Sequence, residues 1–81
     1  MYIGYERGGI FIRIVKTEVL KKTRLQKNLT GEDMAKLLGY KSKQSYYNIE
    51  KGSVNPSAKI MNEISEIFNK PVQYFFNLKV H

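Results

Sequence analysis

The chain has 81 residues, the size of one small domain, and lies near the lower limit at which burial alone offsets the entropy of folding. It has no cysteine, and its one histidine is His81, so disulfide bonds and Cys/His zinc sites are excluded. The 14 Lys+Arg against 7 Asp+Glu give a net charge of +7, which suits a polyanion such as nucleic acid or an anionic membrane surface, although excess charge can also serve solubility alone.

Residues 1–15 are predicted to form an N-terminal extension rather than part of a helical domain. In Ile10–Val15 isoleucine occupies every second position, which is the periodicity of a strand. Gly8-Gly9 is compatible with a small hairpin between Tyr2–Tyr5 and this segment. The same segment is the longest nearly apolar run and contains Arg13, so neither a transmembrane helix nor a signal peptide is expected.

Helical signals begin at Lys16. The first helix is expected from about Thr17, as its N-cap, to Lys27. The second should open at Thr30, since Asp33 follows at the spacing of a capping box, and should end at Gly39 in a left-handed C-cap. The expected inward residues of these two helices are Val19, Leu20, Thr23, Met34, Leu37 and Leu38.

Three further helices are expected before the C-terminal tail, residues 77–81. Ser42 is the predicted N-cap of the third, which runs to Gly52, and Ser57 caps the fourth. A last short helix should start at Pro71. The core stripe of the fourth helix comprises Ile60, Met61, Ile64, Ile67 and Phe68. After it, Phe76, Leu78 and Val80 alternate like a strand, so short β segments are compatible with both termini, paired within one chain or between two.

The third helix is unusually polar. At about 100° per residue, five of its side chains fall within an arc of roughly 140°. These outward residues are Lys43, Gln44, Tyr47, Asn48 and Lys51, and Ser45, Tyr46 and Ile49 lie opposite. Cations, amides and a phenol suit phosphate oxygens and base edges in the major groove of DNA. An ordinary solvated face is the alternative interpretation.

The stretch LTGEDMAKLLGYKSKQSYYNIEKGSVNPS closely resembles the Cro- and lambda-repressor-like helix-turn-helix family, also called XRE-type. The resemblance covers residues 16–76 and implies an all-α fold, a compact five-helix lambda-repressor-like DNA-binding domain. It implies that Ala35 is the small residue of the bracing helix, that Gly39 is the turn, and that Tyr46 and Ile49 point inward. Two departures are Gly31, where the family often has a glutamine, and Tyr40-Lys41, which adds a turn residue and leaves the register open by one position.

Site assignments follow from this context. Base contacts are assigned first to Gln44, whose amide can bridge adenine N6 and N7, and then to Asn48, Ser45 and Tyr47, with Tyr47 alternatively packing on its own protein. Phosphate contacts are assigned to Lys43, Lys51 and the backbone N–H groups of Gly31, Gly52 and Ser53. The resemblance also implies a structural pair between Arg24 and Glu50. For Lys21, Lys22 and Lys27, a basic patch and a solvated face remain equally open.

The functional prediction is a transcriptional regulator that binds double-stranded DNA sequence-specifically by operator occupancy, through a recognition helix at about 43–51. It is expected to be a cytoplasmic homodimer and not an enzyme, because no histidine, cysteine or paired carboxylates suggest a nucleophile or general base. No cofactor, metal, membrane or small-molecule ligand is expected. The rival hypotheses are a protein-interaction module, such as an antitoxin-like partner protein, and a basic peripheral membrane binder.

Overall fold

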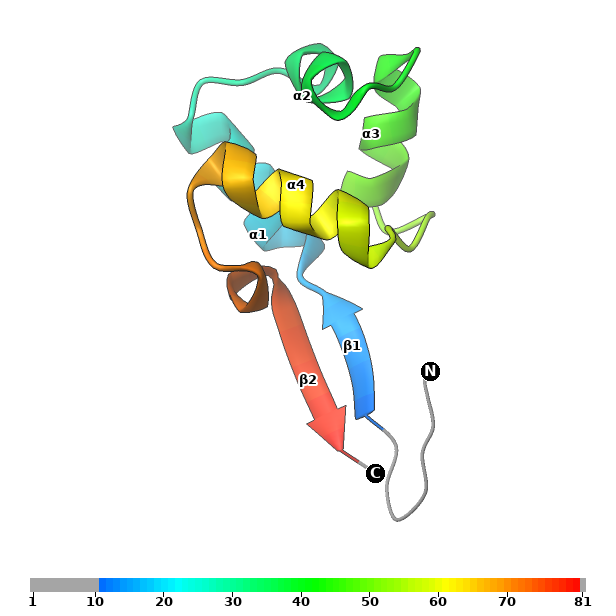
Figure 1. Ribbon diagram of the computed structural model, residues 1–81, viewed down its shortest axis with the longest axis vertical. Helices are drawn as coiled ribbons and strands as arrows, with labels where there is room; N and C mark the ends of the chain where they lie inside the picture. The colour runs from blue at the N-terminus through cyan, green and yellow to red at the C-terminus, as the bar shows by residue number, and fades with distance from the viewer. Residues whose placement is uncertain (1–10, 81) are drawn as a thin grey trace.

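A computed structural model describes residues 11–80 of the chain. Four α-helices form the body, as the all-α prediction requires, and a two-stranded ribbon extends from it (Figure 1). In chain order the elements are β1 (Phe11–Val15), α1 (Thr17–Gln26), α2 (Gly31–Leu38), α3 (Lys43–Glu50), α4 (Ala58–Phe68), the 3-10 turn η1 (Val72–Phe75) and β2 (Phe76–Val80). In the described part of the chain, no helix is long and apolar enough to cross a membrane.

The ends of the helices are determined by short-range capping. At the start of α2, the Asp33 N–H donates to the Thr30 hydroxyl at 3.0 Å and the Thr30 N–H donates to the Asp33 carboxylate at 2.9 Å, which completes the expected capping box. Gly39 ends α2 in a left-handed conformation with φ 80°, which a side chain would strain. At α4 the Ser57 hydroxyl accepts from the Ile60 N–H at 3.2 Å.

The limits of α1 and α3 differ slightly from the sequence-based expectation, although the predicted N-cap of α3 is confirmed. Lys16 is the N-cap of α1, so Thr17 is already the first helical residue. Ser42 is the N-cap of α3, but its side chain makes no capping hydrogen bond. The helix ends at Glu50, before the predicted Gly52. Each shift is only one or two residues, since terminal turns lack the full set of backbone bonds.

The expected fifth helix is wrong as an α-helix, because Val72–Phe75 forms a single 3-10 turn. Only four residues separate Pro71 from the extended backbone of Phe76, and an α-helix needs a longer segment to close successive i→i−4 bonds. The carbonyl of Phe75 accepts instead from the Lys16 N–H at 2.8 Å, which ties the start of the ribbon to the body.

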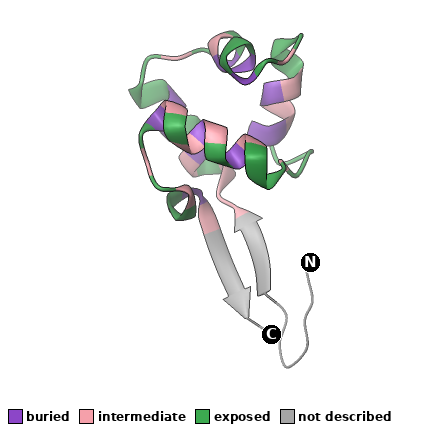
Figure 2. Cartoon of the chain, viewed as in Figure 1, coloured by how far each residue is buried: buried purple, intermediate pink, exposed green. Residues whose placement is uncertain are grey.

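The core lies between the inner faces of the helices, with η1 contributing one side chain (Figure 2). The buried hydrophobic residues are Leu20, Met34, Ala35, Leu38, Tyr46, Ile49, Met61, Ile64, Phe68 and Phe75. Leu37 was expected in this set, but it is 58 % exposed because it lies about 60° outside the arc that α2 buries. Ile60 and Ile67 are half-buried at the edge of the core.

The two strands pair with each other in an antiparallel ladder that runs from Phe11 opposite Val80 to Val15 opposite Phe76. The segments on which the sequence left two options open therefore pair within one chain. Val15 and Phe76 also pack against the core, where the ribbon joins the body. The predicted hairpin at Gly8-Gly9 lies outside the described residues.

Candidate nucleic-acid interface

The α3 helix is oriented by two side chains that enter the core. Tyr46 and Ile49 are 0 % and 1 % exposed, so the expected inward positions are occupied despite the additional residue in the turn. Lys43, Gln44 and Lys51 lie on the exposed surface at α3, and Ser45, Tyr47 and Asn48 are half-buried. α3 packs against both α1 and α2, so its polar arc faces away from the core.

The amides of Gln44 and Asn48 form a pair on the exposed side of α3. Gln44 Nε2 donates to Asn48 Oδ1 at 3.0 Å, and the i, i+4 spacing places both on neighbouring turns. One Gln44 N–H and its Oε1 are not used in this bond. A side chain held in this way can still offer one donor and one acceptor, the pattern that matches adenine N7 and N6.

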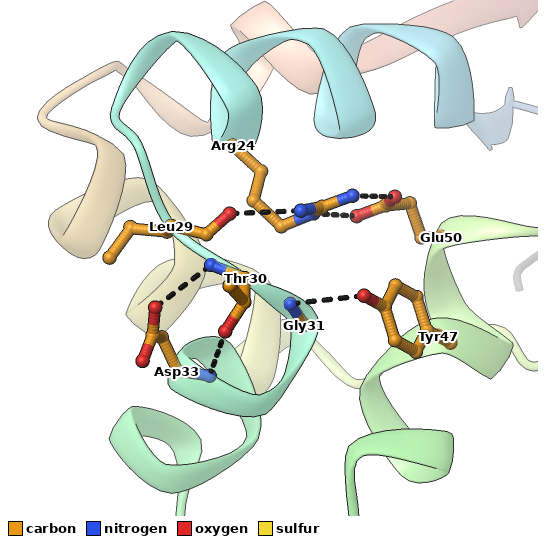
Figure 3. A network of polar contacts seen from close by, with 7 residues as sticks. All are labelled: Arg24, Leu29, Thr30, Gly31, Asp33, Tyr47 and Glu50. Atoms are coloured by element: carbon orange, nitrogen blue, oxygen red, sulfur yellow. Dashed lines mark hydrogen bonds and ion pairs between the residues drawn. The ribbon is translucent and has the colours of Figure 1, made fainter.

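A buried ion pair joins α1 to the end of α3. Arg24 Nε and Nη2 donate to the two carboxylate oxygens of Glu50 at 2.8 and 3.0 Å, and both side chains are almost fully buried (Figure 3). Arg24 Nη1 donates to the carbonyl of Leu29 at 2.9 Å, so the same guanidinium also holds the loop that leads into α2. Hydrogen bonding to the Glu50 carboxylate raises the pKa of Arg24 above its ordinary value, so the guanidinium keeps its charge.

The hydroxyl of Tyr46 lies close to this pair. It is fully buried and makes no hydrogen bond within the described residues. Burial, and then the neighbouring Glu50, raise the pKa of Tyr46 far above its ordinary value. The side chain is therefore a neutral core residue in which the ring packs well and the hydroxyl is costly.

Tyr47 folds back against its own protein. Its hydroxyl accepts from the Gly31 N–H at 3.2 Å, and its ring centroid lies 5.6 Å from Arg24 Cζ (Figure 3). Of the two options that the sequence left for Tyr47, packing on the protein surface is the one that the structure shows. The backbone N–H of Gly31, assigned to a phosphate, is engaged by this hydroxyl.

A hollow of about 560 Å³ opens between α1 and α3. Its lining residues are Lys21, Arg24, Gln44, Tyr47, Glu50 and Lys51. Arg24 and Glu50 neutralise each other, so Lys21 and Lys51 supply the net charge of the hollow. The sequence alone left Lys21 undecided, although its i, i+3 spacing to Arg24 was a signal that the two share a face of α1.

The loop after α3 has its backbone donors in use. The Gly52 N–H donates to the Ile49 carbonyl at 3.1 Å and the Ser53 N–H to the Asn48 carbonyl at 2.9 Å. Both residues are exposed, and Gly52 has a φ of 84°. The two backbone N–H groups assigned to phosphate binding here are therefore engaged within the chain, and the Ser53 hydroxyl is a further donor of this loop.

Comparison with known proteins decides the family. A family model described as helix-turn-helix (HTH_3) matches residues 20–75. The chain belongs to the XRE-type helix-turn-helix family. It is similar to an HTH-type transcriptional regulator of Methanocaldococcus jannaschii, with 42 % identity over 57 residues that cover 70 % of this chain and 85 % of the relative. It is also similar to an HTH-type transcriptional regulator of Archaeoglobus fulgidus, with 33 % identity over 57 residues, 70 % of this chain and 79 % of that relative.

In this helix-turn-helix domain α2 and α3 are the two helices on either side of the turn. The structure brings Gln44, Asn48, Lys43 and Lys51 together on one exposed arc of α3. Tyr47 lines the hollow beside Gln44 and Lys51, but its hydroxyl is engaged by the first turn of α2. The helix-turn-helix unit thus presents a face of amides and lysines.

Proposed function

We propose that this protein binds double-stranded DNA through α3 and regulates transcription by occupying an operator, with no chemistry of its own. The observation that carries the proposal is the exposed face of α3, where paired amides lie between lysines. A helix of this character fits the major groove of B-DNA. The helix-turn-helix family and the two relatives named as transcriptional regulators support the same function.

Sequence reading is assigned to Gln44, with Asn48 as its support. The side-chain oxygen of Asn48, Oδ1, accepts from one N–H of the Gln44 amide. The second N–H of that amide is left for adenine N7, and its oxygen Oε1 is left for adenine N6. Ordering this side chain before DNA arrives lowers the entropy cost of binding. Ser45 is half-buried at the start of α3 and remains a secondary candidate.

Phosphate binding is assigned to the lysines around this face. Lys43 lies at the start of α3 and Lys51 just beyond its end, so the two can engage backbone phosphates on either side of the base contacts. Lys21 adds a third cation from α1, across the hollow from Lys51. The Ser53 hydroxyl offers a neutral contact in the loop after α3.

Titration of mixed-sequence duplex DNA across a salt series tests this function. Affinity should fall steeply with salt because bound lysines release condensed counterions, and about 6 phosphate contacts per dimer give a log–log slope of about −5. Lys21→Ala should reduce the magnitude of that slope by about one unit for each protomer bound. Lys22→Ala is the matched control, because it removes the same charge from α1 outside the hollow. A flat salt response would rule out DNA binding.

A homodimer and a cytoplasmic location complete the proposal. In the described chain the sheet consists of β1 and β2 alone, and a sheet of two strands gains stability when further strands join it. Pairing between two ribbons would place two recognition helices on one DNA duplex, the arrangement that operator symmetry matches.

The rival hypothesis, an interaction module such as an antitoxin-like partner, predicts that isolated protein binds duplex weakly and without salt dependence. A peripheral membrane binder would instead bind anionic vesicles. The exposed α3 face favours neither rival, because it pairs amides with lysines and carries no apolar stripe.

A further inference from the structure

Gly31 and Tyr47 fit together so closely that a side chain at position 31 would have to displace the tyrosine ring. Gly31 is the first residue of α2 and is buried. A Cβ atom built on it would overlap with Cζ, Cε2 and the hydroxyl oxygen of Tyr47. The ring of Tyr47 therefore occupies the space that any other residue at position 31 would need for its side chain.

Two interactions, with Gly31 and with Arg24, hold the ring of Tyr47 in this position. Its hydroxyl accepts from the Gly31 N–H at 3.2 Å, and the Arg24 guanidinium lies 5.6 Å from the ring centroid. Arg24 is itself held by Glu50 at 2.8 Å. The side chain of Tyr47 thus touches α2 and α1 from its position on α3, and a displacement of the whole ring would lose both interactions.

We propose that Gly31 and Tyr47 are an interlocked pair that sets the orientation of α3 against α2, and that Tyr47 is a positioning residue for DNA recognition and not a base reader. The role in recognition rests on the proposed DNA-binding function. Gln44 lies three residues before Tyr47 on the same helix. If the Tyr47 ring changes its position against α2, α3 changes its orientation, and the Gln44 amide meets a base edge at a different place. The consequence is that sequence discrimination by α3 depends on a glycine in α2 that touches no base.

Thermal melting of five variants tests the interlock itself: Gly31→Ala, Tyr47→Ala, Tyr47→Phe, and Gly31→Ala combined with each of the two Tyr47 substitutions. Alanine is the better helix former, so Gly31→Ala should raise the melting temperature wherever its Cβ has room. We expect it to lower the melting temperature when an aromatic ring, of tyrosine or of phenylalanine, is present at position 47. In the Tyr47→Ala background it should raise the melting temperature by a few degrees. A rise in the wild-type background would overturn the interlock.

DNA binding at a temperature at which every variant is folded tests the positioning role. Gly31→Ala should reduce the ratio of operator to random-duplex affinity by roughly 5- to 150-fold, the discrimination carried by one bidentate base contact. Tyr47→Phe keeps the ring and should retain most of the ratio that Tyr47→Ala loses. Tyr74→Phe, at an exposed tyrosine of η1, is the control for hydroxyl removal. A ratio unchanged by Gly31→Ala would overturn the positioning role.

Hydrogen exchange at the Gly31 amide tests the contact between Gly31 and Tyr47 without DNA. Its hydrogen exchange should become faster in Tyr47→Phe, because the acceptor of its N–H is removed, while exchange in the middle of α4 stays the same. Unchanged exchange at Gly31 would contradict the hydrogen bond. If the intact chain failed to bind any duplex, the proposed function and the role in recognition would fall together, whereas the melting results would still decide the interlock.

Discussion

Single residues in this protein connect helices that are far apart in the sequence. Arg24 holds Glu50 and the Leu29 carbonyl with three of its N–H groups, so one guanidinium joins α1, the loop before α2 and the end of α3. Because the pair is buried, its main effect is on geometry, and its net contribution to stability is smaller than the cost of breaking it.

We expect a double-mutant cycle of Arg24→Ala and Glu50→Ala to give a coupling energy of about 0.5–3 kcal/mol, since the two side chains form a bidentate pair. Either single substitution leaves a buried charge without its partner and should destabilise the fold by roughly 3–5 kcal/mol. Urea denaturation of the four proteins measures these energies. Additive effects would mean that the two charges act independently.

Tyr46→Phe should leave the free energy of unfolding unchanged or raise it by up to about 1 kcal/mol, because the lost hydroxyl has no hydrogen-bond partner in the described structure while the ring is retained. Tyr74→Phe, at an exposed tyrosine, serves as the comparison in the same denaturation experiment. A clear loss of stability at position 46 would show that the hydroxyl is satisfied.

The individual helices owe their limits to local interactions and their faces to the core. α2 has a capping box at its start and a left-handed glycine at its end, so its eight residues are well delimited. α3 lacks a side-chain cap and depends more on Tyr46, Ile49 and its ion pair to stay in place. The recognition helix is thus the one whose orientation depends most on tertiary contacts.

Acid should destabilise α2 through its capping box. Hydrogen bonds from the Thr30 backbone and hydroxyl lower the pKa of Asp33 below its ordinary value of 3.8. A carboxylate whose pKa is lowered by folding stabilises the fold above its unfolded pKa, and this contribution is lost as the pH falls through the folded value. Melting temperature as a function of pH should therefore fall less steeply in Asp33→Asn than in the wild type below pH 3.8. Parallel curves would exclude this origin.

Along α3, the start and the end should affect DNA binding differently. Gln44→Ala should cost about 1–3 kcal/mol on an operator and little on random duplex, because one base contact supplies that discrimination. Lys51→Ala should weaken both similarly, since phosphates carry no sequence information. Affinity measurements on operator and random duplexes separate the two roles. Equal losses for Gln44→Ala on both duplexes would reject it as the base reader.

At the scale of the whole molecule, the proposed function gives the ribbon and the helical body different tasks. The ribbon leaves the body beside η1, where the Lys16 N–H bonds to the Phe75 carbonyl, and extends away from α3 (Figure 1). This geometry leaves α3 clear of any pairing between ribbons. The proposed dimerisation and the proposed DNA binding would therefore use separate surfaces.

We expect the intact chain to sediment as a dimer and a chain without residues 1–14, which lacks nearly all of β1, to sediment as a monomer. The reason is that two short strands per protomer form a stable sheet only when more strands join them. Circular dichroism of the shortened chain checks that its helices remain folded. A dimer that persists without those residues would place the interface elsewhere.

The sequence by itself determined where most helices begin and end and which face of α3 points into the core. Caps such as Thr30 with Asp33, and the left-handed Gly39, act within a few residues, and the inward spacing of Tyr46 and Ile49 repeats within one helix. These features are local, so the residue pattern is sufficient to predict them.

Only the tertiary structure decided which side chains from different elements meet. In the structure Leu37 is exposed and the Tyr47 hydroxyl contacts the Gly31 N–H. Lys21 and Lys51 line one hollow, and β1 pairs with β2. Helical periodicity states which residues share a face, but the rotation of that face toward a neighbour depends on how both elements pack. That rotation is set by contacts between residues far apart in the sequence, which a pattern within one helix does not contain.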